Sequence, residues 1–149
     1  MKNNNTRNVH QPLKNVNIIV MVLLSIFSLG FYMGVWMLNR KNDIQQLSMR
    51  NHISFGLWRL FTVGLFLFLS LNILKNFIFT EYGFLLIDSY DTIFTFFFIG
   101  LVNYSAFRLV ELLEKKTDMK FNKVLLTFFN VFYIQFKVNR EYKNTDIVE

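Results

Sequence analysis

Apolar residues fill two long stretches in the middle of the chain, and a segment rich in acidic residues separates them. The first stretch, residues 53–74, contains a single charge, Arg59, and as a helix it would reach roughly 33 Å at about 1.5 Å per residue. The second, residues 92–110, is rich in phenylalanine and meets its first charge at Arg108. A hydrocarbon core is about 30 Å thick and offers the backbone no hydrogen-bond partners. We therefore expect a transmembrane helical hairpin.

An earlier apolar stretch, residues 16–38, is uncharged and long enough to span a bilayer if it forms one continuous helix. Gly30 and Gly34 interrupt it, and Ser-Leu-Gly-Phe-Tyr around Gly30 is typical of a local break. We expect a re-entrant segment that returns near Gly30, and the alternative is a spanning helix. The two glycines are also spaced as a close-packing motif, which would serve packing within the chain or dimerisation.

Polar residues dominate the first segment, 1–15, which we expect to be a mobile tail. A basic start before an apolar stretch resembles a signal peptide. Here the apolar stretch is longer than such peptides use and no small-x-small site ends it, so we expect it to be retained.

The last part of the chain, residues 115–143, alternates polar and apolar residues with a helical period. We expect a basic amphipathic helix lying in the headgroup plane. Its uncharged centre, residues 124–136, would cover only about 20 Å, which is too short to span. A fourth, short spanning helix is the alternative. The cations expected to contact anionic lipid headgroups are Lys116, Lys120, Lys123, Lys137 and Arg140.

The formal net charge is +6, which raises the question of nucleic-acid binding. The lysines and arginines flank apolar stretches instead of lining one folded face, so anionic lipid headgroups are the expected partner and nucleic acid is not. The absence of cysteine excludes disulfides and thiolate metal sites.

Basic residues favour the cytoplasmic side of a membrane. They precede and follow the first apolar stretch and gather again after residue 115, whereas the hairpin turn holds only Lys75. We expect a multi-pass protein of the cytoplasmic membrane with both basic termini inside and the acidic turn outside.

Ionisable residues near membrane depth are costly unless they are paired or hydrated. An antiparallel hairpin that turns near residue 83 brings Arg59 level with about residue 107. We therefore expect Arg59 to pair with Glu111, one turn further on, or else to extend towards lipid phosphate. Asp88 and Asp91 would complement the dipole of a helix that begins beside them, with Ser89 or Asp91 as its cap and Lys75 as a partner at the outer rim. The alternative places both aspartates inside the membrane as proton or cation sites.

A weak internal similarity links the segments that begin at Leu23 and Leu125, Leu-Leu-Ser-Ile-Phe-Ser-Leu-Gly-Phe-Tyr and Leu-Leu-Thr-Phe-Phe-Asn-Val-Phe-Tyr. Each leads to an Asn-Arg pair. If the similarity is not chance, two related elements bracket the hairpin.

The same two regions resemble a known family. Ser-Leu-Gly-Phe-Tyr-Met-Gly-Val-Trp, which ends at Trp36, resembles the T-L-G-I-Y-x-x-Y-W signature of the bacterial domain-of-unknown-function family 4234. Phe-Tyr-Ile-Gln-Phe-Lys-Val-Asn-Arg, which ends at Arg140, is similar to its closing Y-L-Q-Y-K-I-N segment. The resemblance covers most of residues 16–140, with Ser28 and Val35 as departures. It implies a small bacterial integral membrane protein and no catalytic residues.

Motifs for catalysis are missing from the sequence, including phosphate-binding loops, Gly-x-Ser-x-Gly and His-Glu-x-x-His. The two histidines, His10 and His52, have no partner at ligand spacing. We expect no enzyme, cofactor or metal site, but a structural, accessory or interaction subunit whose partner is a second copy or another membrane protein. The alternative is an oligomeric channel or small transporter-like protein, with a polar path from Arg59, Asn72, Asn103, Asp88 and Asp91.

Overall fold

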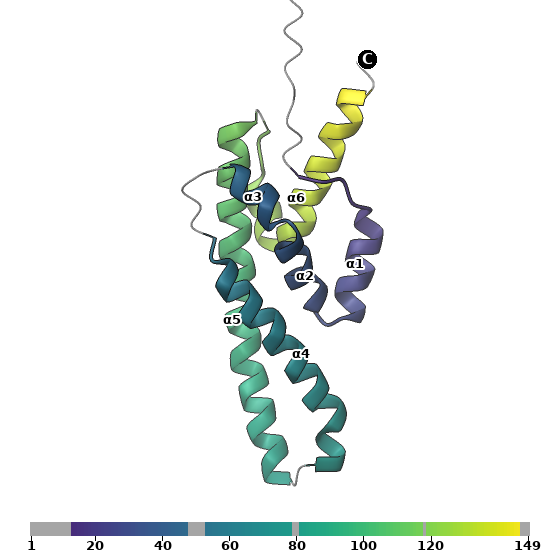
Figure 1. Cartoon of the computed structure of the whole chain (residues 1–149), viewed down its shortest axis with the longest axis vertical. Coiled ribbons are helices and arrows are strands. Elements are labelled where there is room, and N and C mark those ends of the chain that lie inside the picture. The colour runs from purple at the N-terminus through teal and green to yellow at the C-terminus, as the bar shows by residue number, and fades with distance from the viewer. Residues whose placement is uncertain (1–12, 48–52, 79–80, 118, 147–149) are drawn as a thin grey trace, which may run out of the picture.

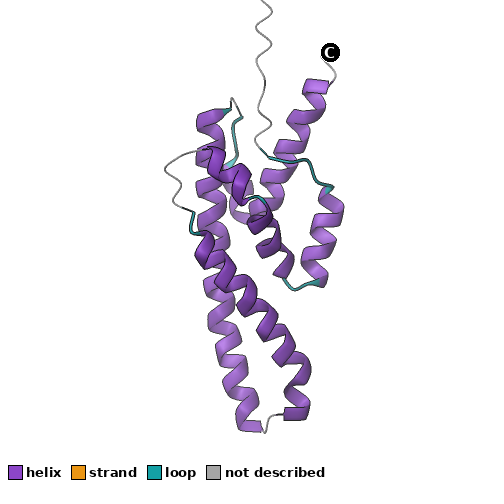
Figure 2. Cartoon of the chain, viewed as in Figure 1, coloured by secondary structure: helices purple, strands orange, loops and turns teal. Residues whose placement is uncertain are grey.

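The computed structural model describes residues 13–47, 53–78, 81–117 and 119–146. Within these ranges the chain is all-helical (Figures 1 and 2). Its helices are α1 (Ile18–Phe27), α2 (Phe31–Asn39), α3 (Lys41–Leu47), α4 (Phe55–Ile78), α5 (Glu81–Lys116) and α6 (Lys123–Asp146). By length and composition, α4 over Phe55–Leu74 and α5 over Leu85–Lys116 are able to cross a membrane. The prediction of an all-helical chain with two such helices is confirmed.

Helices α4 and α5 lie side by side and antiparallel as a long two-helix arm (Figure 1). The other helices gather around the half of α5 that carries its C-terminus, so the opposite half of the arm has no further helix beside it. The N-terminal segment before α1 and the end of α6 lie at the gathered end. We call this the basic end, because it carries Lys14, Arg40, Lys41, Lys115, Lys116, Lys120, Lys123, Lys137 and Arg140.

A sharp turn at residues 28–30 folds α2 back beside α1. Asn17 caps α1, because its Oδ1 accepts from the N–H groups of Ile19 and Val20 at 3.0 and 3.4 Å. The helix then stops where Leu29 and Gly30 adopt positive φ values of 48° and 90°. Glycine adopts positive φ without a steric penalty, whereas leucine is strained in that conformation. Contacts around the turn must therefore stabilise it. The break expected near Gly30 is therefore present.

Aromatic side chains join the two helices of the arm. Trp58 donates from Nε1 to Ser105 Oγ at 2.9 Å, and the rings of Phe61 and Phe97 stack with centroids 5.8 Å apart. Gly64 leaves room for the ring of Phe94, since a Cβ there would lie 2.7 Å from that ring. Such ring pairs contribute about 0.5–1.5 kcal/mol each beyond burial of their area.

The two glycines of the first apolar stretch pack within the chain. Gly34 is buried against Thr62 of α4, where an added Cβ would lie 3.2 Å from Thr62 Cβ and closer still to its hydroxyl. At Gly30 an added Cβ would lie 3.1 Å from the ring of Phe98 on α5. Their own chain thus covers the faces that a dimer would use, which favours the first of the two expectations.

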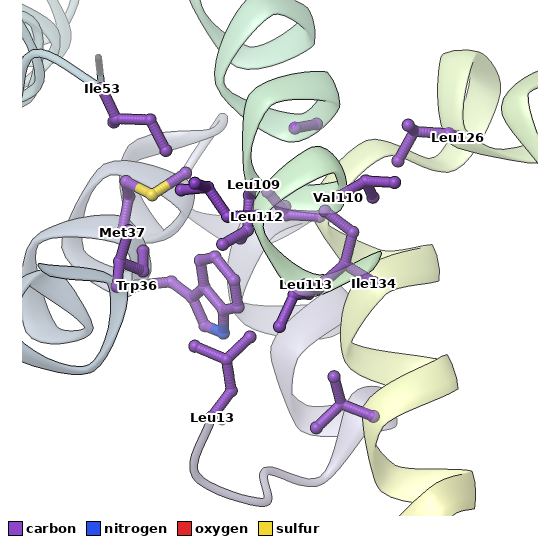
Figure 3. Close-up of a cluster of buried hydrophobic side chains, with 14 of the residues drawn as sticks. Leu13, Trp36, Met37, Ile53, Leu109, Val110, Leu112, Leu113, Leu126 and Ile134 are labelled. Atoms are coloured by element: carbon purple, nitrogen blue, oxygen red, sulfur yellow. The ribbon is translucent and has the colours of Figure 1, made fainter. Parts of the chain in front are cut away.

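The buried core lies at the basic end, where α2, α3, α5 and α6 meet (Figure 3). Trp36 lies at its centre, and Leu13 from the N-terminal segment packs beside it. The other large and fully buried members are Met21, Met37, Ile44, Trp58, Leu109, Leu113, Leu126, Val131 and Ile134. The polar tail expected over residues 1–15 lies mostly outside the described residues, but Leu13 is part of the core.

The second transmembrane segment is longer than predicted. It was expected over residues 92–110, yet α5 begins at Glu81 and continues to Lys116. The acidic residues between the two apolar stretches favour a turn there, but a helix also accommodates such residues on a solvated face. The expectation that Ser89 or Asp91 caps this helix is wrong, because both lie inside it, and Ser89 Oγ donates instead to Leu85 O at 2.8 Å.

The single amphipathic helix expected over residues 115–143 is also wrong. Lys115 and Lys116 end α5, and α6 begins anew at Lys123 with Asn122 Oδ1 accepting from Val124 N–H at 2.9 Å. Within α6, Asn130 has φ 44° and ψ −124°, which breaks the helix into two parts. The apolar period continues across this position, so the pattern gave no warning of the break.

The close contact at Gly34 predicts a loss of stability on adding a single methyl group. We expect Gly34→Ala to lower the free energy of unfolding by about 1–3 kcal/mol, the usual cost of overpacking. Thermal unfolding in detergent, followed by tryptophan fluorescence, measures this. The double variant Gly34→Ala with Thr62→Ala should recover part of the loss, and the matched control Gly56→Ala, where a Cβ meets only Ser54 Oγ at 3.9 Å, should unfold as the parent does. An unchanged Gly34→Ala protein would contradict this packing.

Candidate functional site

A buried arginine at the junction of α2 and α3 is the most unusual polar group in the structure. Arg40 is 6% exposed, although charged side chains are rarely buried without a partner. Its Nη2 donates to Lys14 O at 3.1 Å and to Gln135 Oε1 at 3.2 Å. The guanidinium carbon lies 4.4 Å from the ring centroid of Trp36, a cation–π contact.

Two amides of α6 complete this arrangement. Gln135 is fully buried, and its Nε2 donates to Lys14 O at 3.2 Å and to Asn139 Oδ1 at 2.7 Å. Asn139 Nδ2 donates to Val16 O at 2.6 Å. We call Arg40, Gln135, Asn139 and the carbonyls of Lys14 and Val16 the polar cluster. It fastens the extended segment before α1 to the end of α2 and to the second part of α6.

The direct hydrogen-bond partners of the charge in the polar cluster are neutral groups. Burial lowers the pKa of the Arg40 guanidinium below its ordinary value, and the nearby Tyr32 and Asp43 oppose that shift. An arginine keeps its proton under these conditions, so the cluster holds a permanent cation. A guanidinium and two amides supply neither a nucleophile nor a general base. The arrangement can bind and orient chain segments.

Sequence reasoning did not find the polar cluster. Arg40 entered as a charge that sets topology and, like Asn139, as a member of an Asn-Arg pair in the weak internal similarity, whereas Gln135 entered only through the family resemblance. The signal was present in that resemblance, since Trp36 ends the first motif while Gln135 and Asn139 belong to the second. The two motif segments meet in space at this cluster.

Large apolar side chains are exposed over most of the remaining surface. They cover the arm, and they extend to the turn after α1 and to the first part of α6, where Phe27, Leu29 and Phe128 are 83%, 70% and 76% exposed. We call this surface the apolar belt. Soluble monomers rarely expose contiguous apolar patches beyond a few hundred Å², so the belt marks an interaction surface for lipid or protein.

The expected pair of Arg59 and Glu111 does not form. Glu111 instead binds Arg108 on its own helix and accepts from Lys115 Nζ at 2.8 Å, while Arg59 is exposed. The prediction placed the hairpin turn near residue 83, whereas α4 continues to Ile78 and α5 begins at Glu81. Because Trp58 bonds Ser105, Arg59 lies near the level of residue 104, about 10 Å along the helix from Glu111.

The other predicted residues lie at the following places in the described structure. Asp88 is exposed and Asp91 half-buried, so neither forms the buried carboxylate site that was the alternative. The side chain of Lys75 lies outside the described part of the chain. Lys116 Nζ donates to Gln46 O at 2.6 Å and so joins α5 to α3. Of the remaining predicted lipid contacts, Lys137 is half-buried, and the exposed ones are Lys120, Lys123 and Arg140.

Comparison with protein-family models, curated proteins and solved structures finds no match for this chain. Among the described residues, no group of three histidine, cysteine or acidic side chains could hold a metal ion. The candidate features are therefore the polar cluster and the apolar belt.

The polar cluster predicts protection of one peptide bond from trypsin. Lys14 is exposed and would be a good target, but Arg40 and Gln135 hold its carbonyl oxygen. Arg40→Met and Gln135→Leu keep the side-chain volume and remove these donors. Since a hydrogen bond is worth about 0.5–1.5 kcal/mol, we expect cleavage after Lys14 to become about tenfold faster in each variant. Mass spectrometry of limited digests in detergent measures the rate.

Cleavage after Lys120, in the non-helical segment before α6, provides the internal reference. Arg140→Met is the matched control, because Arg140 is an exposed arginine of the same helix as Gln135 and should leave the rate at Lys14 unchanged. Equal rates at Lys14 in the parent and in both cluster variants would rule out the proposed protection.

Proposed function

We propose that this protein is a structural or accessory subunit of a bacterial cytoplasmic membrane, anchored by α4 and α5 as a transmembrane hairpin. The apolar belt carries this proposal. The arm buries little of its apolar surface within the chain, and a bilayer is the solvent that makes such a surface stable.

Charge-free lengths on the two helices support the transmembrane placement. On α4 no charge occurs between Arg59 and Lys75, and on α5 none occurs between Asp91 and Arg108. At 1.5 Å per residue both intervals are about 25 Å, close to the thickness of a hydrocarbon core. Arg59 and Arg108 lie at those limits of the two intervals that are nearer the basic end. Basic residues favour the cytoplasmic side of a membrane, so this placement supports a cytoplasmic basic end.

The turn between α1 and α2 supports a re-entrant first segment. Gly30 packs against Phe98, which lies ten residues before Arg108 and hence about 15 Å deeper along α5. Backbone at that depth needs hydrogen-bond partners within the protein. The N–H groups of residues 28 to 31 and 33 donate to backbone carbonyls at 2.9–3.1 Å, and Tyr32 N–H donates to Ser28 Oγ at 2.9 Å.

In this arrangement α6 lies at the cytoplasmic surface. Its exposed Phe128 and Phe129 face the bilayer, and its cations are available to anionic headgroups. The partner of such a subunit would be another membrane protein or a second copy. Membership of the family that the sequence resembles belongs to the same proposal, supported by the meeting of both motif segments in the polar cluster.

An oligomeric channel is the second candidate, and the polar residues of the arm argue against it. Asn72 Nδ2 donates to Phe68 O at 3.1 Å, and Asn103 Nδ2 donates to Ile99 O at 3.0 Å. Both amides thus donate to carbonyl oxygens of their own helices, a hydrogen bond that requires no polar path. Dye leakage from liposomes that contain the purified protein separates the two candidates, since a subunit without a pore leaves them sealed.

Cysteine labelling tests the topology. The chain has no cysteine, so single cysteines can be introduced at Asn15, Asn42, Lys120 and Tyr82. We expect an impermeant thiol reagent applied to intact cells to label only the Tyr82 site, because the other three lie at the cytoplasmic basic end. After permeabilisation all four should react, and the cysteine-free parent should never react. Labelling of the Asn15 site in intact cells would overturn the re-entrant arrangement in favour of a spanning first helix.

A further inference from the structure

One face of α5 carries two neighbouring cavities, one apolar and one charged, which we together call the groove. Towards the middle of the arm a cavity of about 590 Å³ lies between α4 and α5, and nearer the basic end a second, of about 610 Å³, lies between α5 and α6. Tyr104 lines both cavities. Among the α5 residues that line them, Ile93, Phe97, Gly100, Tyr104, Phe107, Glu111 and Glu114 recur every three or four positions and so share one helical face.

The apolar half of the groove has the length of one acyl chain. From Ile93 to Tyr104 the helix rises about 16 Å, and half of a hydrocarbon core is about 15 Å. Its floor is open at Gly100, where an added Cβ would meet no atom within 4 Å. Leu57 and Phe61 of α4 form the opposite wall.

The charged half of the groove is lined by two basic and two acidic side chains. Arg108 and Lys123 are the cations that line it, and Glu111 and Glu114 are the anions. Arg108 uses Nη1 on Glu111, while its buried Nε has no partner among the described residues. Glu114 accepts from Phe121 N–H at 3.0 Å through Oε1, and a carboxylate has capacity for several further donors.

Along α5 the charges follow a fixed order from the apolar half of the groove towards the C-terminus of the helix: first a cation, then the two carboxylates. Arg108 follows the apolar half directly, and Glu111 and Glu114 lie one and two turns farther from it, towards the end of the helix. A phospholipid with an amine headgroup has the same order, with its acyl chain first, then the anionic phosphate, and then the ammonium group. A purely anionic headgroup would leave the two carboxylates facing negative charge.

We propose that this groove binds one zwitterionic phospholipid with a primary-amine headgroup. An acyl chain lies along Gly100, the phosphate binds Arg108 and Lys123, and the ammonium donates to Glu114. Carboxylate favours a primary ammonium over a quaternary one because only the former donates hydrogen bonds. This inference rests on the membrane placement proposed above, since the apolar half of the groove must face lipid.

Native mass spectrometry of the full chain tests the proposal. The protein in detergent is mixed with equal amounts of ethanolamine-, choline- and glycerol-headed phospholipids that carry identical acyl chains. We expect one retained lipid per chain, with the ethanolamine form preferred about tenfold over either of the others, as the loss of one charge-assisted interaction predicts. Equal retention of the three, or a preference for the anionic glycerol form, would overturn the proposal.

Three variants connect the binding to the groove. Glu114→Gln keeps an oxygen for Phe121 N–H and should abolish the preference for ethanolamine over choline. Arg108→Gln should weaken retention of all three lipids, and so should Gly100→Leu, whose Cβ would meet no atom within 4 Å. The matched controls are Gly56→Leu, on the exposed start of α4, and Lys120→Gln, an exposed cation outside the groove.

Retention that is the same in Gly100→Leu as in Gly56→Leu would show that the lipid binds elsewhere. Thermal unfolding of every variant identifies any that fails to fold. The membrane placement has its own measurement, because an integral protein stays with the membrane pellet after carbonate extraction. A protein that sediments with membranes but retains the three lipids equally would refute the lipid site alone.

Discussion

The turn at residues 28–30 is the constraint on which the rest of the arrangement depends. Arg40 lies 3.1 Å from the carbonyl of Lys14 only because the chain reverses between them. A continuous helix over the same residues would separate them by about 39 Å. The reversal requires Leu29 and Gly30 to adopt positive φ, a conformation that costs roughly 1–2 kcal/mol for the leucine. The internal hydrogen bonds of the turn and the polar cluster at its open end offset that cost, so the two features stabilise each other.

The second break, at Asn130, has a comparable consequence for α6. It separates a short first part with exposed phenylalanines from a second part that directs Gln135 and Asn139 to the segment before α1. The two breaks also lie near each other. Gly30 and Asn130 line one cavity of about 620 Å³, with Phe98 of α5 beside them. Both breaks fall within the weakly similar segments that begin at Leu23 and Leu125, and this coincidence is what a pair of related elements bracketing the hairpin would produce.

Features that depend on local sequence were predictable, and features that depend on distant contacts were not. The apolar stretches predicted α4 and much of α5 because length and hydropathy decide whether a helix suits a membrane. Gly30 predicted its own break, because glycine tolerates positive φ. Asn130 breaks α6 without such a signal. The partnership of Arg40 with Gln135 joins residues 95 positions apart, which no helical period reveals. The error at Arg59 and Glu111 arose from a hairpin turn placed a few residues too late.

The division of the chain into a packed end and an exposed arm limits where specific recognition can occur. The arm exposes most of its large apolar side chains, and the amides of Asn72 and Asn103 donate to carbonyls of their own helices, so the outer surface of the arm offers mainly apolar contacts. The basic end has a core with Trp36 at its centre, a desolvated cation held by neutral groups, and exposed charges of both signs. Polar contacts confer specificity because an unmatched partner leaves buried groups without hydrogen bonds. In the membrane arrangement proposed above, the arm would hold the basic end at the membrane surface, and a partner would be selected at that end.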